Sequence, residues 1–92
     1  KLTYTDVIDV LQYICKNSDS EKVGPVTVSE IQALLKIRKD IEVSDQTIRN
    51  KGFRKHGYFE KRWPDVCTFN HVGDTRLRGM ILKGEDFLEA TQ

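Results

Sequence analysis

Apolar residues recur at helical spacing near the start of the chain. In residues 5–16 they fall three and four positions apart with polar side chains between them, which predicts an amphipathic helix. Thr3 or Thr5 can cap its first turn, because a threonine hydroxyl accepts from free backbone N–H groups. Residues 25–28 are rich in β-branched side chains and too few for a helix, so they are predicted to form a short strand.

A second helix is predicted to start at Ser29 and to end near Lys39. Ser29 and Gln32 have the spacing of a capping box, in which each side chain satisfies a free N–H at the helix start. The stripe predicted to face the core consists of Ile31, Leu34 and Leu35.

The central segment begins with a predicted third helix over residues 44–56. Ser44 suits the helix start, and Gly57 suits a helix stop because glycine adopts positive φ without penalty. The residues predicted to line the inward side are Ile48, Phe53 and His56. Gly52 interrupts this pattern, which indicates a local bulge or a close contact at that position.

The C-terminal part changes to period two, which is typical of strands. Residues 58–82 are predicted to form a three-stranded antiparallel meander, with turns at 63–65 and 73–74. In its second strand, one face is predicted to hold Cys67 and Phe69 and the other Thr68 and Asn70. Residues 84–90 are predicted to form a last short helix or a linker.

This order of elements resembles that of a winged helix-turn-helix DNA-binding domain. The residues that carry the resemblance are VTVSEIQALL at 26–35, VSDQTIRNKGFRKHGYFEKR at 43–62 and the strand pairs that follow. The resemblance covers nearly the whole chain. It implies an α+β winged-helix fold, with three core helices and a small antiparallel sheet, in one domain spanning residues 1–92. The link between the second and third helices is longer than that of a tight helix-turn-helix.

Charge in this chain is focused rather than abundant. The sequence has 15 Lys and Arg against 14 Asp and Glu, a formal net charge of +1 over 92 residues. Between Arg49 and Arg62, however, six basic residues accompany a single acid, Glu60, while acids gather near both ends. A basic stretch in a nearly neutral chain favours a polyanionic partner over a merely solvated helix face.

The third helix and the strands supply the candidate DNA contacts. The outward arc of the helix has amide, hydroxyl and cationic side chains, which suit base edges and phosphates in a major groove. This arc holds Gln46, Thr47, Asn50, Lys51 and Arg54, with Arg49 and Lys55 suited to phosphates. The predicted contacts of the wing are Arg62, Trp63, Arg76 and Arg78. Trp63 could equally pack on the core, because tryptophan buries a large apolar area.

Metal binding and catalysis are not predicted. The only candidate set, Cys15, His56, Cys67 and His71, lacks the paired short spacings of a zinc site. No phosphate loop, catalytic triad or pair of catalytic carboxylates is present, so we expect neither a cofactor nor an enzyme activity. The two cysteines sit among apolar residues without a CxxC spacing. This predicts reduced thiols in an intracellular protein, either cytoplasmic or with DNA in a nucleoid or nucleus.

The expected partner is duplex DNA, and Tyr58, Phe59 and Trp63 beside basic residues leave single-stranded DNA open. The alternative is a docking domain for another protein, since winged helices also serve in that way. Over a few residues, HGYFEKRW and RLRGMILK are similar to the terminal winged-helix module of phage and mobile-element replication helicase-primases. That similarity implies a module of a larger replication or transcription-regulating protein. No apolar run is long enough to span a membrane.

Overall fold

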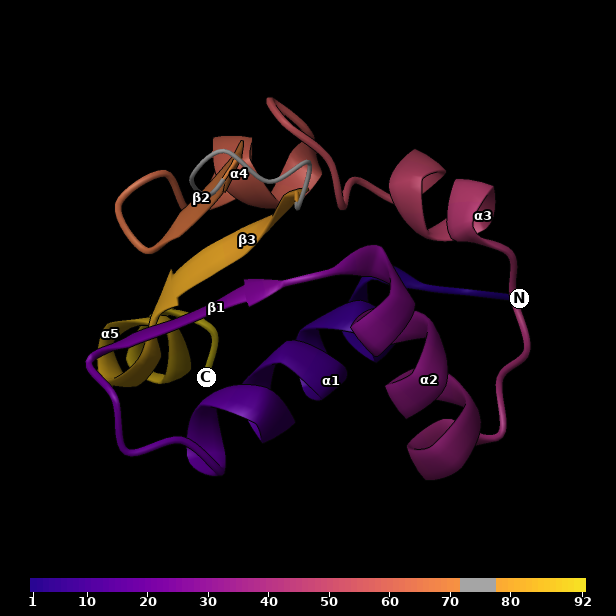
Figure 1. The fold of residues 1–92 in the computed structure, drawn as a ribbon, viewed down its shortest axis with the longest axis horizontal. Helices are drawn as coiled ribbons and strands as arrows, with labels where there is room; N and C mark the ends of the chain where they lie inside the picture. The colour runs from indigo at the N-terminus through magenta and orange to yellow at the C-terminus, as the bar shows by residue number, and fades with distance from the viewer. Residues whose placement is uncertain (72–77) are drawn as a thin grey trace.

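The computed structural model describes residues 1–71 and 78–92, and within these ranges the chain is an α+β fold of five helices and a three-stranded antiparallel sheet (Figure 1). The elements in order are α1 (Tyr4–Lys16), β1 (Lys22–Val26), α2 (Val28–Lys39), α3 (Asp45–Asn50), α4 (Tyr58–Arg62), β2 (Cys67–His71), β3 (Arg78–Lys83) and α5 (Gly84–Ala90). In Figure 1, α1 and α2 lie below the sheet, while α3 and α4 lie toward the top of the view. None of the helices in the described ranges is long and apolar enough to span a membrane.

The first helix forms as predicted, with Thr3 as its cap. The Thr3 hydroxyl accepts from the Asp6 N–H at 3.1 Å, and the Asp6 carboxylate accepts from the Thr3 N–H at 3.0 Å. Two free donors of the first turn are thereby satisfied reciprocally. Near the middle of α1, the Gln12 amide donates to the Thr91 hydroxyl at 2.9 Å, which ties the end of α5 to α1.

The predicted cap of the second helix is wrong. α2 begins at Val28, and the Thr27 hydroxyl accepts from the Glu30 N–H at 3.2 Å, whereas Ser29 lies inside the first turn. Thr27 and Glu30 are three residues apart, as are Ser29 and Gln32 of the predicted cap. Val28 is buried against the core, so the helix begins there and Thr27 becomes its cap. The strand predicted at 25–28 accordingly starts and ends earlier, as β1.

The third helix is much shorter than predicted. Ser44 caps it as expected, with its hydroxyl accepting from the Thr47 N–H at 3.2 Å, but α3 ends at Asn50. Gly52 has φ +93°, and a Cβ there would lie 2.4 Å from the Tyr58 Cβ. The close contact anticipated at this glycine therefore ends the helix instead of bulging it.

The segment after α3 also departs from the prediction. Gly57 is not a helix stop with positive φ, because it has φ −85° and precedes α4 as its cap residue. The positive φ falls on His56, at 60°. Tyr58 and Phe59 lie in α4 and not in a strand. An apolar pair this short has no period that separates strand from helix, so tertiary packing decides.

The sheet has the predicted number of strands but not the predicted meander. Its order is β1-β3-β2, so the third strand is β1 and pairs with β3, whereas the strand predicted to begin at Tyr58 would have paired with β2. β2 pairs with β3 through Phe69↔Met80, and β1 pairs with the same residue of β3 through Val26. The predicted turn at 73–74 lies outside the described residues.

The core gathers apolar side chains from the helices and the sheet. Its fully buried aromatic side chains are Phe53, Phe59 and Phe87. Cys67 and Phe69 of β2 are buried and the residue after each is exposed, as the alternation predicted. Of the three residues predicted to face inward from the third helix, Ile48 and Phe53 are fully buried, but His56 is exposed.

Both cysteines are free and buried, as predicted. Burial raises the pKa of the Cys15 thiol to about 11. Burial, together with the like charges of Cys15 and Glu60, raises the pKa of the Cys67 thiol to about 12. Both thiols are therefore protonated at neutral pH and act as small apolar core side chains.

Candidate nucleic-acid interface

Four cationic side chains converge on one hollow of ≈ 270 Å³ between α3, the loop after it and the β2–β3 pair. We call this the basic hollow. Its lining residues are Arg49, Arg54, Lys55, Phe69, Asn70 and Arg78. No acid stands among these lining residues, so the hollow suits a ligand with several negative charges.

The backbone brings these cations together from three places. Arg49 extends from the last turn of α3, where it is half-buried. The turn at Gly52, in which the Arg54 N–H donates to the Gly52 carbonyl at 3.0 Å, reverses the chain so that Arg54 and Lys55 return beside Arg49. Arg78 is the first residue of β3 and reaches the hollow through the pairing of β3 with β2.

The charge of the basic hollow is not neutralised within residues 1–71 and 78–92. Ion pairs in these ranges involve other cations, namely Lys36, Lys39 and His56. Glu60, the single acid of the central basic segment, accepts from the backbone N–H of His56 and, at 3.1 Å, from that of Phe69. Both oxygens of its carboxylate thus accept hydrogen bonds from backbone N–H groups. Four like charges held close together repel one another, and a bound anion would relieve that repulsion.

The predicted outward arc of the third helix is divided in two. Gln46, Thr47 and Asn50 are exposed on α3, where the Gln46 amide donates to the Asn50 carbonyl oxygen at 2.9 Å. Arg54, predicted to lie on the same arc, is beyond the end of the helix and lines the basic hollow. With six residues, α3 is only about 9 Å long.

Lys51 belongs to neither group. Its Nζ lies 4.8 Å from the centroid of the Tyr4 ring. A second hollow of ≈ 200 Å³ is lined by Lys1, Leu2, Thr47, Asn50 and Lys51. The sequence analysis missed Tyr4, because its spacing from Ile8 fits the apolar stripe of α1. It also missed that Asn70 lines the basic hollow, although its predicted place on the outer face of β2 could have indicated an exposed contact.

Arg62 and Trp63 lie outside the basic hollow. The Arg62 guanidinium carbon is 5.1 Å from the centroid of the Trp63 ring. Trp63 is half-buried and lies nearly parallel to Phe59, with ring centroids 6.2 Å apart, so it packs on the core and keeps part of its surface accessible. Arg76, the remaining predicted wing contact, lies outside the described residues.

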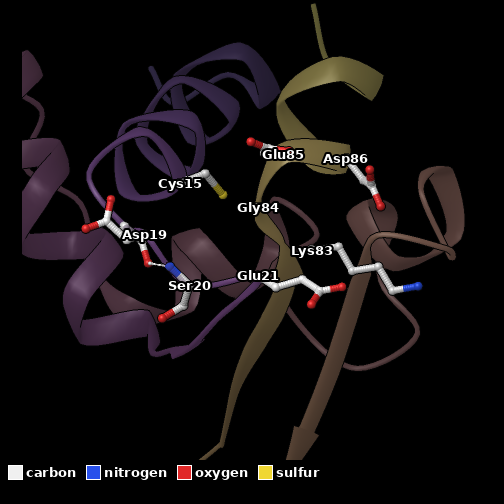
Figure 2. Close-up of a pocket in the computed structure, with 9 residues that line it drawn as sticks. Cys15, Asp19, Ser20, Glu21, Lys83, Gly84, Glu85 and Asp86 are labelled. Atoms are coloured by element: carbon white, nitrogen blue, oxygen red, sulfur yellow. Dashed lines mark hydrogen bonds between the residues drawn. The ribbon is translucent and has the colours of Figure 1, made fainter.

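A larger hollow of ≈ 440 Å³, with mostly acidic charged residues, lies between the end of α1, the loop before β1 and the start of α5 (Figure 2). We call it the acidic hollow. Its charged lining residues are Asp19, Glu21, Lys83, Glu85 and Asp86. Figure 2 shows these carboxylates entering from different sides without converging on one point. Among the described residues, no group of three His, Cys, Asp or Glu side chains could hold a metal ion.

No family model, curated protein or solved structure matches the chain. The chemistry of its described surface is therefore the guide to its function, and the basic hollow is where four cations meet.

Proposed function

We propose that the chain is a winged-helix DNA-binding module that grips the backbone of duplex DNA at the basic hollow. The observation that carries the proposal is the convergence of Arg49, Arg54, Lys55 and Arg78 with no acid among the lining residues. Cations that neutralise phosphates release the counterions condensed on DNA, which makes such contacts favourable at moderate salt.

The order of elements supports the winged-helix assignment. A helix, a strand, three helices and two antiparallel strands follow one another, and β1 pairs with the last strand. Apart from α4, this is the order on which the sequence resemblance rests. α4 is an additional element between the third helix and β2.

In this proposal, α3 presents Gln46, Thr47 and Asn50 toward the major groove, and the basic hollow holds the flanking phosphates. A helix of six residues reaches few base pairs. We therefore expect low sequence selectivity, with affinity coming mainly from the backbone contacts. Lys51 and Arg62 are proposed as further cationic contacts outside the hollow, and Arg76 is proposed as a DNA contact from the sequence alone.

The proposed setting is a larger protein that acts on DNA. The resemblance to replication modules drew on a strand at HGYFEKRW, but Tyr58–Arg62 forms α4. That resemblance therefore adds little, and the proposal for the setting rests on DNA binding alone.

A protein-docking function has weaker support. Ile37 on α2 is 78 % exposed, which marks it as a possible apolar anchor. A single exposed aliphatic side chain is ordinary on a protein surface, and an anchor site needs neighbours that exclude water around it. We therefore favour DNA as the partner.

Fluorescence anisotropy of a labelled blunt random duplex over a salt series tests the proposal. We expect the logarithm of the association constant to fall with the logarithm of salt concentration with a slope of about −3 to −4, for four phosphate contacts. Arg49→Glu/Arg54→Glu should weaken binding about a hundredfold or more and reduce the slope by about 2.

The matched control is Lys16→Glu/Lys22→Glu, which makes the same change in net charge at two exposed lysines away from the hollow. It should change affinity only a few-fold. Equal losses in the two double variants would refute a local site. Absence of binding by the folded wild-type protein at low salt would refute DNA binding altogether.

A further inference from the structure

Two exposed tyrosines from distant parts of the chain stack on each other. The rings of Tyr4, at the start of α1, and Tyr58, at the start of α4, have centroids 3.9 Å apart and planes 20° apart. Tyr4 is 39 % exposed and Tyr58 is 37 % exposed. Among the described residues, Ile37 is the one other large hydrophobic side chain that is exposed to this extent. Exposed aromatic surface is thus concentrated at one place.

The stacked pair belongs to a longer row with a cation at each end. Trp63 meets Tyr58 edge to face, with centroids 6.2 Å apart and planes 89° apart. Lys51 Nζ lies 4.8 Å from the Tyr4 centroid, and the Arg62 guanidinium lies 5.1 Å from that of Trp63. We call Tyr4, Tyr58 and Trp63 the aromatic row.

The rings of the aromatic row are held in place by the fold. The backbone at Gly52 packs so closely on the Tyr58 Cβ that no larger residue fits. Phe59, which is fully buried, contacts Tyr4 edge to face at 6.1 Å and Tyr58 at 5.2 Å. A ligand that binds such rings orders little new structure, so little of the interaction energy is lost.

We infer that unpaired nucleic-acid bases stack on the aromatic row, beside the duplex held at the basic hollow. The inference rests on the proposed function and adds a single-stranded segment to its substrate. Every base has an aromatic face and is followed by a phosphate, so a single strand is bound by exposed rings that have cations beside them. An apolar protein anchor would not need Lys51 and Arg62, and neither forms an ion pair within the described part of the chain.

The aromatic row also adjoins the basic hollow in sequence. Gly52, whose backbone packs on the Tyr58 Cβ, lies in sequence between Arg49 and Arg54, so the segment that carries two cations of the hollow also contacts a ring of the row. The favoured substrate is therefore a junction, in which a duplex continues into a single strand.

Two probes separate this inference from the proposed function. One is the blunt duplex, and the other is the same duplex with a short thymidine tail. We expect wild-type protein to bind the tailed probe about tenfold more tightly, from stacking of one or two bases. Tyr4→Leu/Tyr58→Leu should lose that gain and keep the affinity for the blunt duplex. Tyr4→Phe/Tyr58→Phe, which keeps both rings, should retain the gain.

Trp63 provides an independent readout, because it is the single tryptophan of the chain. A short thymidine oligonucleotide should quench its emission in the wild-type and Phe proteins, but much less in the Leu protein. Lys51→Gln/Arg62→Gln keeps all three rings and should lower the ratio of the affinity for the tailed probe to that for the blunt duplex several-fold, which tests the row without touching the core.

Equal affinity of the wild-type protein for the two probes would overturn the inference and leave duplex binding intact. Binding of the tail without binding of the blunt duplex would support the inference and refute the duplex proposal.

Discussion

The basic hollow and the acidic hollow have opposite chemistry. The basic hollow, ≈ 270 Å³, is lined by four cations and no acid. The acidic hollow, ≈ 440 Å³, is lined by four carboxylates and one lysine. The larger of the two has carboxylates that diverge, whereas the smaller combines cations from three separate segments (Figure 2). Size alone therefore says less about function than the convergence of like charges.

A net charge of +1 therefore does not show that a polyanion would prefer the basic hollow to the acidic one. The lining of one hollow is basic and that of the other is mostly acidic, so the two hollows carry local fields of opposite sign. A polyanion is attracted to the first and repelled by the second.

The largest expected effect comes from reversing charge within each hollow. Arg54→Glu/Arg78→Glu removes one cation from the loop and one from β3, and should weaken duplex binding by about a hundredfold or more at near-physiological salt. Asp19→Lys/Glu85→Lys makes the opposite charge change in the acidic hollow. It should strengthen binding by no more than about threefold, because the interaction is distant and screened. Anisotropy titrations measure both, and a larger effect at the acidic hollow would contradict the assignment of the site.

The next largest effect is on stability and concerns two glycines, Gly52 and Gly84. Gly52→Ala forces a residue with Cβ into φ +93° and into contact with Tyr58, and should lower the free energy of unfolding by about 2–3 kcal/mol. Gly84→Ala, at the acidic hollow, would place a Cβ 3.3 Å from a Val23 methyl and adds helix propensity to α5. Its effect should stay within about 1 kcal/mol. Denaturant unfolding of both variants tests the difference.

The same glycine explains the main errors of the sequence analysis. The helix caps at Thr3 and Ser44 follow from local chemistry and were predicted, whereas the cap predicted at Ser29 and the stop predicted at Gly57 were wrong. The length of the helix expected over 44–56 was predicted wrongly, because the positive φ at Gly52 goes with a contact to Tyr58, and the local sequence does not reveal that Tyr58 is the partner. The same contact places Tyr58 at the start of α4 and removes the predicted strand.

The composition of the site was predictable, but its arrangement was not. All four cations of the basic hollow were among the predicted contacts, since a local excess of charge is visible in sequence. Their grouping depends on the pairing of β2 with β3, which brings Arg78 beside the loop. Tyr4 escaped prediction because only the packing of α1 against α4 brings it to Tyr58.

A smaller effect distinguishes a cation that forms ion pairs, which should contribute to stability, from one that does not, which should contribute to DNA affinity. Lys39 lies 3.0 Å from the Asp6 carboxylate and 2.6 Å from that of Asp9, whereas Arg54 has no ion pair in the described ranges. Lys39→Met should lower the free energy of unfolding by about 1 kcal/mol and leave DNA affinity unchanged. Arg54→Met should do the reverse, with affinity falling about tenfold and stability unchanged. Parallel unfolding and binding curves decide, and a loss of affinity in the Lys39 variant would contradict the distinction.

The smallest effect is a pH dependence at the same ion pair. Burial raises the pKa of the Asp6 carboxyl, but hydrogen bonds from Lys39 and Thr3 and the charge of Lys39 outweigh it, so its pKa is lowered from 3.8. The stability it contributes is therefore fully present above pH 3.8 and is lost as pH falls through the lowered pKa. Asp6→Asn should remove this part of the acid sensitivity and lower stability at neutral pH by up to about 1 kcal/mol. Unfolding curves of variant and wild type should differ at pH 7 and approach each other as the pH falls below 3.8.

The hydrogen bonds of Glu60 have a further consequence for self-association. β1 and β2 are the outer strands of the sheet, and an outer strand with free N–H groups can pair with another chain. On β2, the Phe69 N–H donates to Glu60 and the Cys67 N–H donates to the Trp63 carbonyl. On β1, Pro25 has no N–H to offer. Both borders of the sheet are thus closed to strand addition at these positions, which disfavours edge-to-edge pairing between copies of the chain there.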